Sequence, residues 1–267
     1  MKVAIIGAGR MGGTIVQMLK KDSGSGWSLE VCEPNQKGRD VLAKEVGSGV
    51  KFVDRVEALG EGEVVLLAVK PAMLREVAGW LQSRKSSYLL ISILAGVTTE
   101  TLAKEAGGKA RVVRAMPNQA LRVGEGVTAL CAGSGAKKED VGVAQKIFAL
   151  GGSVLEIGEE QMDVVTALSG SGPAFMAKWV GELGVAAERL GLGRQVAEEL
   201  AAKTMLGTGA LLVREGITPR ELCAAVASPG GTTEAGLKVM QSGGIEVLAE
   251  KAMSAAVKRA KELAKGG

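Results

Sequence analysis

The first twelve residues constrain the fold more than any other segment of this chain. A short apolar run, Lys2–Ile6, leads directly into Gly7-Ala8-Gly9-Arg10-Met11-Gly12, and a helical pattern follows. In a strand–turn–helix of this kind, the first glycine permits a tight turn, the second lets a pyrophosphate approach the backbone and the third lets the helix pack on the strand. The helix N-terminus adds amide donors and a positive dipole. We therefore expect a dinucleotide to bind at Gly7, Gly9, Arg10, Met11 and Gly12; a purely structural glycine turn is the alternative.

Residues 1–158 alternate short β-branched runs with helical segments. Such alternation predicts a Rossmann-type α/β domain, a parallel sheet wrapped by helices on both faces. The run Val64–Val69 is apolar at every position, which is typical of a strand covered on both sides. The expected strands are Lys2–Ile6, Ser28–Cys32, Lys51–Val53, Val64–Val69, Tyr88–Ile93, Arg111–Arg114, Gly126–Cys131 and Ser153–Ile157, and the expected helices include Met11–Lys21, Lys37–Val46 and Met73–Arg84.

From residue 159 onward the pattern is helical only. Breaks are expected at Gly191–Gly193, Gly216–Pro219, Ser228–Gly231 and Ser242–Gly244. At roughly 150 residues per domain the chain suits about two domains, so we predict a dinucleotide-binding domain over 1–158 and an all-helical domain over 159–267. The helices carry wide apolar faces that a small core could not bury alone, so a homo-oligomer is expected. These faces include Val185, Ala186, Leu190, Val196, Leu200, Met205, Leu206, Ala210 and Leu211.

Composition excludes several classes of protein. Thirty-three basic and twenty-nine acidic residues leave a net charge of only +4, and aromatic residues make up 3%, so nucleic acid is not an expected partner. No apolar run approaches the roughly 20 residues of a membrane span, and Gly7 and Gly9 interrupt the apolar opening before a signal-peptide core could form. The cysteines, Cys32, Cys131 and Cys223, have no metal-ligand spacing and are expected as small buried residues in a reducing, cytoplasmic setting, with no metal site.

The end of the second strand bears on the cofactor. Glu33 lies about 20 residues beyond the glycine turn, where a carboxylate holds the adenosine ribose and favours NAD. Asn35, Lys37 and Arg39 follow at once and could instead bind a 2′-phosphate. A third interpretation is that Glu33 is only a solvated loop residue.

Three further strand ends are candidates for the cofactor crevice, because ligands of open parallel sheets lie beyond the carboxyl ends of the strands. They are Val69-Lys70-Pro71, Ala95-Gly96 and Met116-Pro117-Asn118, each of which could also be an ordinary loop.

The complete absence of histidine narrows the reaction. Reduction of a ketone makes an alkoxide, which needs a proton from a residue such as His, Lys or Tyr. Tyr88, the only tyrosine, has Ser92 rather than a lysine four residues on, and Lys178 is the best remaining donor. An imine can arrive already protonated and then needs only a hydride. The sequence therefore favours reduction of a C=N bond.

Two stretches of the helical half make a family resemblance specific. Leu168-Ser169-Gly170-Ser171-Gly172-Pro173-Ala174-Phe175 leads into a helix, and Ser228-Pro229-Gly230-Gly231-Thr232-Thr233 lies between two later helices. Together with the glycine turn, Val69-Lys70-Pro71 and Arg114-Ala115-Met116-Pro117-Asn118, these stretches resemble pyrroline-5-carboxylate reductase over the whole chain. Departures are Gln119-Ala120 where the family often has Thr-Pro, which leaves the path of that loop open, and Glu33 in a family that often prefers NADPH.

The resemblance implies the reduction of 1-pyrroline-5-carboxylate to L-proline, the last step of proline biosynthesis, with NADPH or NADH. It also implies a Rossmann domain, a helical dimerisation domain and a homodimer or higher homo-oligomer. The substrate would meet the loop of a partner chain, where Ser228, Gly230, Gly231, Thr232 and Thr233 bind its carboxylate and Thr233 bonds the ring nitrogen as the catalytic residue. Free amides before a helix suit an anion, although the same groups could simply cap the helix.

Two other functions stay open. A β-hydroxyacid dehydrogenase shares the two-domain plan but places a helical lysine nearer its glycine turn than Lys178 is to Gly172. A non-catalytic dinucleotide sensor would bind NAD(P)H without oxidising it.

Overall fold

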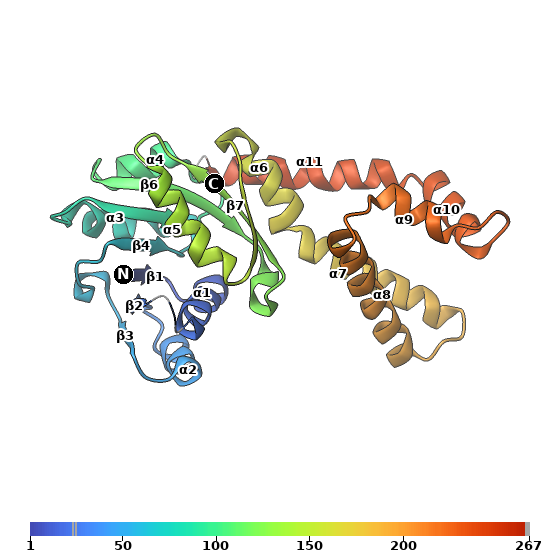
Figure 1. The fold of residues 1–267 in the computed structure, drawn as a ribbon, viewed down its shortest axis with the longest axis horizontal. Helices are drawn as coiled ribbons and strands as arrows, with labels where there is room; N and C mark the ends of the chain where they lie inside the picture. The colour runs from blue at the N-terminus through green and yellow to red at the C-terminus, as the bar shows by residue number, and fades with distance from the viewer. Residues whose placement is uncertain (23, 25, 265–267) are drawn as a thin grey trace. The chain divides into compact units, whose positions relative to one another are not determined.

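A computed structural model describes the chain except residues 23, 25 and 265–267 (Figure 1). The chain forms two compact units, the first made of Met1–Ser171 with the segment that begins at Ala256, and the second of Gly172–Ala255. These units do not coincide with the domains expected over 1–158 and 159–267, and that domain division stays a prediction.

The first unit is built on one sheet with strand order β3-β2-β1-β4-β5-β6-β7-β8. Its strands are β1 (Lys2–Ile6), β2 (Ser28–Cys32), β3 (Val50–Val53), β4 (Val64–Leu67), β5 (Tyr88–Ser92), β6 (Ala110–Pro117), β7 (Gly126–Ala132) and β8 (Gly152–Glu156). Strands β1 to β6 are mutually parallel in the doubly wound order, which confirms the Rossmann-type prediction. The expectation of a wholly parallel sheet is wrong at one place, because β7 runs antiparallel to β6, with β8 parallel to β7.

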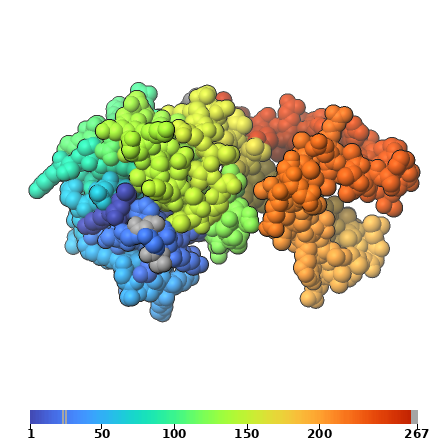
Figure 2. All heavy atoms as spheres, viewed as in Figure 1, coloured from blue at the N-terminus to red at the C-terminus, as the bar shows by residue number. Residues whose placement is uncertain are grey.

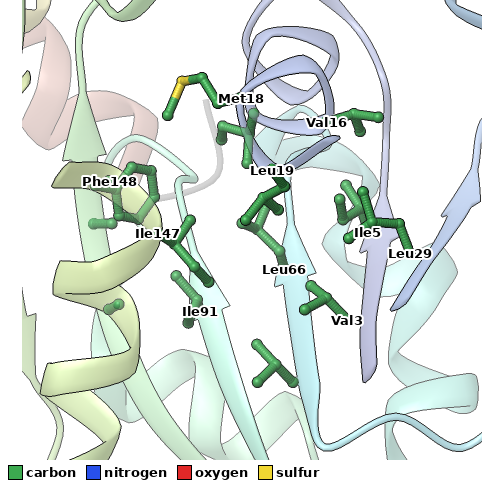
Figure 3. Close-up of a cluster of buried hydrophobic side chains, with 14 of the residues drawn as sticks. Val3, Ile5, Val16, Met18, Leu19, Leu29, Leu66, Ile91, Ile147 and Phe148 are labelled. Atoms are coloured by element: carbon green, nitrogen blue, oxygen red, sulfur yellow. The ribbon is translucent and has the colours of Figure 1, made fainter. Parts of the chain in front are cut away.

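Helices cover both faces of this sheet. On one face α1 (Arg10–Lys21), α2 (Gln36–Val46) and α5 (Lys138–Ala149) pack on side chains of β1, β4 and β5, where Figure 3 shows Leu19, Ile147 and Phe148 meeting Leu66 and Ile91. On the other face α3 (Leu74–Ser83) and α4 (Thr99–Glu105) cover a second buried cluster. In Figure 2 the yellow-green atoms of α5 lie on the face of the first unit that is turned toward the viewer. Burial on both faces explains the apolar run of β4.

Short helical turns connect these elements. They are η1 (Val56–Ala58), η2 (Pro71–Met73), η3 (Gln119–Val123) and η4 (Glu159–Gln161), followed by α6 (Met162–Val165) and a π-helical turn, η5 (Thr166–Gly170). Strand β4 ends at Leu67, so Ala68 and Val69 belong to the loop before η2 and not to the strand as expected.

The second unit is helical, as predicted. It contains α7 (Gly172–Arg189), α8 (Arg194–Arg214), α9 (Pro219–Val226) and α10 (Thr232–Ser242), and α11 (Ile245–Ala264) begins in it. All four expected breaks separate these helices. Helices α7 and α8 lie side by side (Figure 1). In the described part of the chain, no helix is long and apolar enough to cross a membrane.

Candidate functional site

The glycine turn adopts the geometry that a dinucleotide requires. Gly7 has φ +91° and its amide donates to the Cys32 carbonyl oxygen at 2.8 Å, so the chain turns sharply where β1 ends. A Cβ at Gly7 would lie 2.7 Å from the Ala68 carbonyl oxygen, and one at Gly12 would collide with the Gly7 carbonyl oxygen. At Gly9, by contrast, a Cβ would meet no atom of the described chain within 4 Å. The open side of the turn is thus at Gly9, where a phosphate would approach.

Glu33, which follows β2, stabilises the same turn through hydrogen bonds. Its carboxylate accepts hydrogen bonds from the Ala8 amide at 2.8 Å and from the Asn35 amide at 3.0 Å. Asn35 caps α2 by accepting from the Gly38 amide, and Arg39 donates to the Glu33 and Pro34 carbonyl oxygens. Glu33 is therefore an ordered part of the turn, and not only a solvated loop residue.

A groove of about 490 Å³ opens beside Gly9, between α1 and α2. Its lining includes the turn residues Ala8 and Gly9 and the basic side chains of Arg10, Lys37 and Arg122. The groove is also lined by one carboxylate, Glu45, so the cations outnumber the anion three to one. This excess of positive charge, with an open glycine and the amides of the α1 N-terminus, favours phosphate groups. The residues present therefore fit a dinucleotide.

The other predicted cofactor residues lie at the same edge of the sheet. Val69, Lys70 and Pro71 follow β4. The Val69 side chain packs beside Gly7, where an added Cβ would lie 3.1 Å from Val69 Cγ1. Ala95 and Gly96 form the turn after β5, with φ +76° at Gly96. Because β1, β4 and β5 are parallel neighbours, their carboxyl ends converge.

Asn118 directly follows β6, and its side-chain oxygen accepts from the amides of Ala120 and Val127. These bonds start η3, which settles the path of the loop that carries Gln119 and Ala120. Asn118 thus shapes the loop at this strand end.

A buried polar cluster behind the Ala95–Gly96 turn was not singled out by the sequence. The Glu159 carboxylate accepts from the Thr99 amide at 2.7 Å and from the Thr99 hydroxyl at 2.6 Å, and it pairs with Arg114 at 3.4 Å. Arg114 is 2% exposed. No spacing rule could link Glu159 to Thr99, because the contact joins segments 60 residues apart.

Cys32 and Cys131 are buried as expected, whereas the same expectation is wrong for Cys223, which is exposed. Both buried thiols are held protonated. Burial raises the pKa of Cys131 to about 11, with a further contribution from the charge of Glu159. Burial and the neighbouring Glu33 likewise raise the pKa of Cys32 to about 11. Neither thiol is therefore a nucleophile near neutral pH.

The predicted substrate loop lies in the second unit. Gly230 has φ +72°, and the Gly231 amide donates to the Ser228 carbonyl oxygen at 2.9 Å. Helix α10 starts after Gly231 with no side-chain cap, so the first amides of the helix, at Thr232 and Thr233, lack an intrahelical acceptor. The Thr233 hydroxyl has no partner among the described residues, so a capping role does not explain it.

A carboxylate already binds this loop from within the chain. Glu234 accepts from the Gly230 amide at 2.7 Å and pairs with Lys238 at 2.9 Å. The Lys238 hydrogen bond, with that of the Gly230 amide, lowers the pKa of Glu234. The amides of Thr232 and Thr233 are therefore available to bind an anion, whereas the Gly230 amide is already bound to Glu234.

The structure thus brings the predicted cofactor residues together and, separately, the predicted substrate residues. Lys178, the candidate proton donor, lies on α7 and pairs with Glu182 one helical turn away. It is 78% exposed.

Comparisons with known proteins find related proteins for both halves of the chain. A family model described as pyrroline-5-carboxylate reductase dimerisation matches residues 159–263, and one described as NADP oxidoreductase coenzyme F420-dependent matches residues 2–96. A pyrroline-5-carboxylate reductase from Synechocystis sp. is 37% identical over 99% of this chain and 98% of its own length. The chain belongs to the pyrroline-5-carboxylate reductase family.

Solved structures of the family agree with this assignment. The pyrroline-5-carboxylate reductase of Coxiella burnetii superposes with a TM-score of 0.87 at 35% identity, covering 98% of this chain and 97% of that chain. That of Plasmodium falciparum, solved with NADP bound, has a TM-score of 0.81 at 25% identity, covering 99% and 100%. The family assignment removes the sequence-based alternative of a β-hydroxyacid dehydrogenase.

Proposed function

We propose that this chain is an NAD(P)H-dependent reductase that converts 1-pyrroline-5-carboxylate to L-proline, the last step of proline biosynthesis. The observation that carries the proposal is the 37% identity with a pyrroline-5-carboxylate reductase over 99% of the chain. In this proposal the glycine turn would bind the cofactor and the Ser228–Thr233 loop would bind the substrate.

The cofactor would be held at the carboxyl ends of the strands. Gly7, Gly9 and Gly12 with Arg10 and Met11 would receive the pyrophosphate, and Glu33 and Asn35 would lie at the adenosine ribose. Val69, Lys70, Pro71, Ala95, Gly96 and Asn118 would line the path toward the nicotinamide. When bound, the reduced nicotinamide supplies the hydride that the C=N carbon accepts. Basic side chains in the adjoining groove support this arrangement.

The substrate would be held by the loop before α10. The amides of Thr232 and Thr233 would donate to its carboxylate, and Ser228, Gly230 and Gly231 would shape the turn that presents them. The Thr233 hydroxyl would accept a hydrogen bond from the protonated ring nitrogen, which orients the C=N bond. The iminium already carries the proton that becomes the amine hydrogen of proline, so the chain needs no acid group to complete the reaction.

The second half of the chain matches a dimerisation domain, and we propose a homodimer in which the loop of one subunit completes the site of the other. Exposed apolar side chains, such as Leu190 just after α7 at 89% and Leu206 on α8 at 71%, support a covering partner chain. A cytoplasmic, reducing location belongs to the same proposal, and the free state of Cys32, Cys131 and Cys223 is compatible with it.

Steady-state oxidation of NADH and of NADPH with 1-pyrroline-5-carboxylate tests the function. We expect saturable turnover with at least one cofactor, and none with a 2-oxoacid in place of the imine. Tight binding of NAD(P)H without turnover on any cyclic imine would instead identify a dinucleotide sensor.

A further inference from the structure

Arg114 is a buried charge in the sheet with few polar partners in the described part of the chain. It lies on β6 with 3% of its side chain exposed, yet its Nε and Nη2 atoms have no hydrogen-bond partner in the described part of the chain. Among the described residues, its one ionic contact is the 3.4 Å pair with Glu159. A buried ion pair is weak as a source of stability, because desolvation of the charges offsets their attraction. Its value is therefore in the geometry that it imposes.

The strand register shows which segment the Arg114–Glu159 pair can position. Arg114 pairs with Ser92, the last residue of β5, so the guanidinium lies at the level where the chain leaves the sheet. The turn over residues 93–98 starts there, carries Ala95 and Gly96, and ends at Thr99, the first residue of α4. Glu159 holds that end by accepting hydrogen bonds from the amide and the hydroxyl of Thr99.

The two ends of this turn are thus fixed by different means. At its start the Ile93 amide donates to the Leu67 carbonyl oxygen of β4 at 3.0 Å. At its end the constraint comes from Glu159, on η4, which in turn contacts Arg114 in the sheet. Loss of the Arg114–Glu159 pair would weaken the constraint at the second end and leave the Ile93 hydrogen bond at the first end in place.

We propose that Arg114 and Glu159 form a positioning pair. The pair would fix the position of the 93–98 turn relative to the nicotinamide half of the bound cofactor. This inference rests on the proposed function. Hydride transfer then depends on the pair, whereas binding of the adenosine half, held at the glycine turn and Glu33, does not.

The chain contains a matched control for a merely structural role. Arg84 is also 2% exposed, also has an unpartnered Nε and pairs with Glu61 at 3.3 Å. It lies between α3 and β5, and its Nη2 donates to the Gly62 carbonyl oxygen just before β4, at the edge where these strands begin. A change at Arg84 should affect stability and leave the opposite edge intact.

The test compares Glu159→Gln and Arg114→Lys with Arg84→Lys in the full-length protein. The measurements are the single-turnover rate of NADPH oxidation with 1-pyrroline-5-carboxylate, the Kd of NADPH and the Kd of 2′,5′-ADP. We expect the rate to fall about tenfold or more in the first two variants, since small misplacements of a reacting group are costly. Both Kd values should stay within about threefold. Arg84→Lys should lower Tm and keep the rate.

Thr99→Val is a milder variant in case Arg114→Lys does not fold. It removes one hydrogen bond to Glu159, so the rate should fall several-fold, and Thr99→Ser should restore it. Wild-type rates in both Glu159→Gln and Thr99→Val would overturn the inference, as would a parallel loss of 2′,5′-ADP affinity. Absence of turnover in the wild-type protein would refute the proposed function itself, so the two failures are distinguishable.

Discussion

Gly9 and Gly12 belong to one turn but have opposite surroundings. Gly9 has φ −62°, which any residue can adopt, and its side-chain direction is open, whereas a Cβ at Gly12 would strike the Gly7 carbonyl oxygen. The open space at Gly9 supports the proposed phosphate contact, whereas Gly12 serves helix–strand packing. Substitutions at these two glycines should therefore have different effects, on cofactor binding at Gly9 and on stability at Gly12.

Gly9→Val should abolish binding of NADH and NADPH and leave the fold intact. The new side chain would fill the space that a pyrophosphate oxygen needs, with Tm within about 2 °C of wild type. Gly12→Ala is the control, and it should lower Tm by several degrees because overpacking costs about 1–3 kcal/mol. Titration of cofactor fluorescence and thermal unfolding measure both effects. Unchanged NADH affinity in Gly9→Val would contradict the assignment of the turn.

Glu33 offers a second prediction at this scale, on the choice of cofactor. Its carboxylate should repel a 2′-phosphate, so the wild-type protein should use NADH at least as well as NADPH. Glu33→Gln keeps an oxygen for the Ala8 amide and removes the charge, and it should shift the kcat/KM ratio toward NADPH about tenfold, or 1.4 kcal/mol. Asp40→Asn, an exposed change on α2, is the control. An unmoved ratio, or a tenfold wild-type preference for NADPH, would show that Asn35, Lys37 or Arg39 dominates.

At the scale of elements, two helix N-termini with different chemistry stand close in the sequence. Helix α9 has a capping box in which the Thr218 hydroxyl accepts from the Glu221 amide at 3.2 Å and Glu221 accepts from Thr218. Helix α10 follows Gly231 and has no side-chain cap. A threonine thus caps α9, whereas Thr232 and Thr233 of α10 form no side-chain cap within the described chain, as the proposed substrate site requires.

Thr233→Ala should therefore lower kcat/KM for 1-pyrroline-5-carboxylate about tenfold or more, since a hydrogen bond to a charged group contributes roughly 1.5–3 kcal/mol. Cofactor affinity and Tm should barely change. Thr218→Ala should do the opposite, destabilising the protein by about 1 kcal/mol while turnover persists. Steady-state kinetics and urea unfolding of the two variants decide the matter. A Thr233→Ala enzyme with wild-type turnover would leave Thr233 without a catalytic role.

Local patterns predicted most elements, and non-local contacts account for what they missed. Every expected strand is present, because apolar runs between glycine turns are a local signal. The antiparallel direction of β7 depends on how η3 returns the chain, and the shape of η3 comes from Asn118 bonds that no pattern announces. In the site, the glycine turn was predictable from spacing, whereas the contact of Glu159 with Thr99 exists only in the folded sheet.

At the scale of the whole molecule, the helical half exposes more apolar surface than a monomer would keep. Sedimentation velocity should give at least twice the chain mass of 27.3 kDa. Leu206→Glu, on α8, should produce monomers because it places a charge on the apolar surface, whereas Val41→Glu, at a 57% exposed position on α2, should not. A monomeric wild-type protein with full activity would contradict the dimer proposal.

In the proposed reaction, this chain directs a hydride to the C=N carbon of 1-pyrroline-5-carboxylate. The most direct measurement is incubation of the wild-type protein with this imine and NADPH or NADH deuterated at nicotinamide C4, on each face in turn, followed by mass and NMR analysis of the product. We predict L-proline with one deuterium on the ring carbon of the former C=N bond, from one of the two labelled faces only. Unlabelled proline from both faces, or no proline at all, would contradict the account.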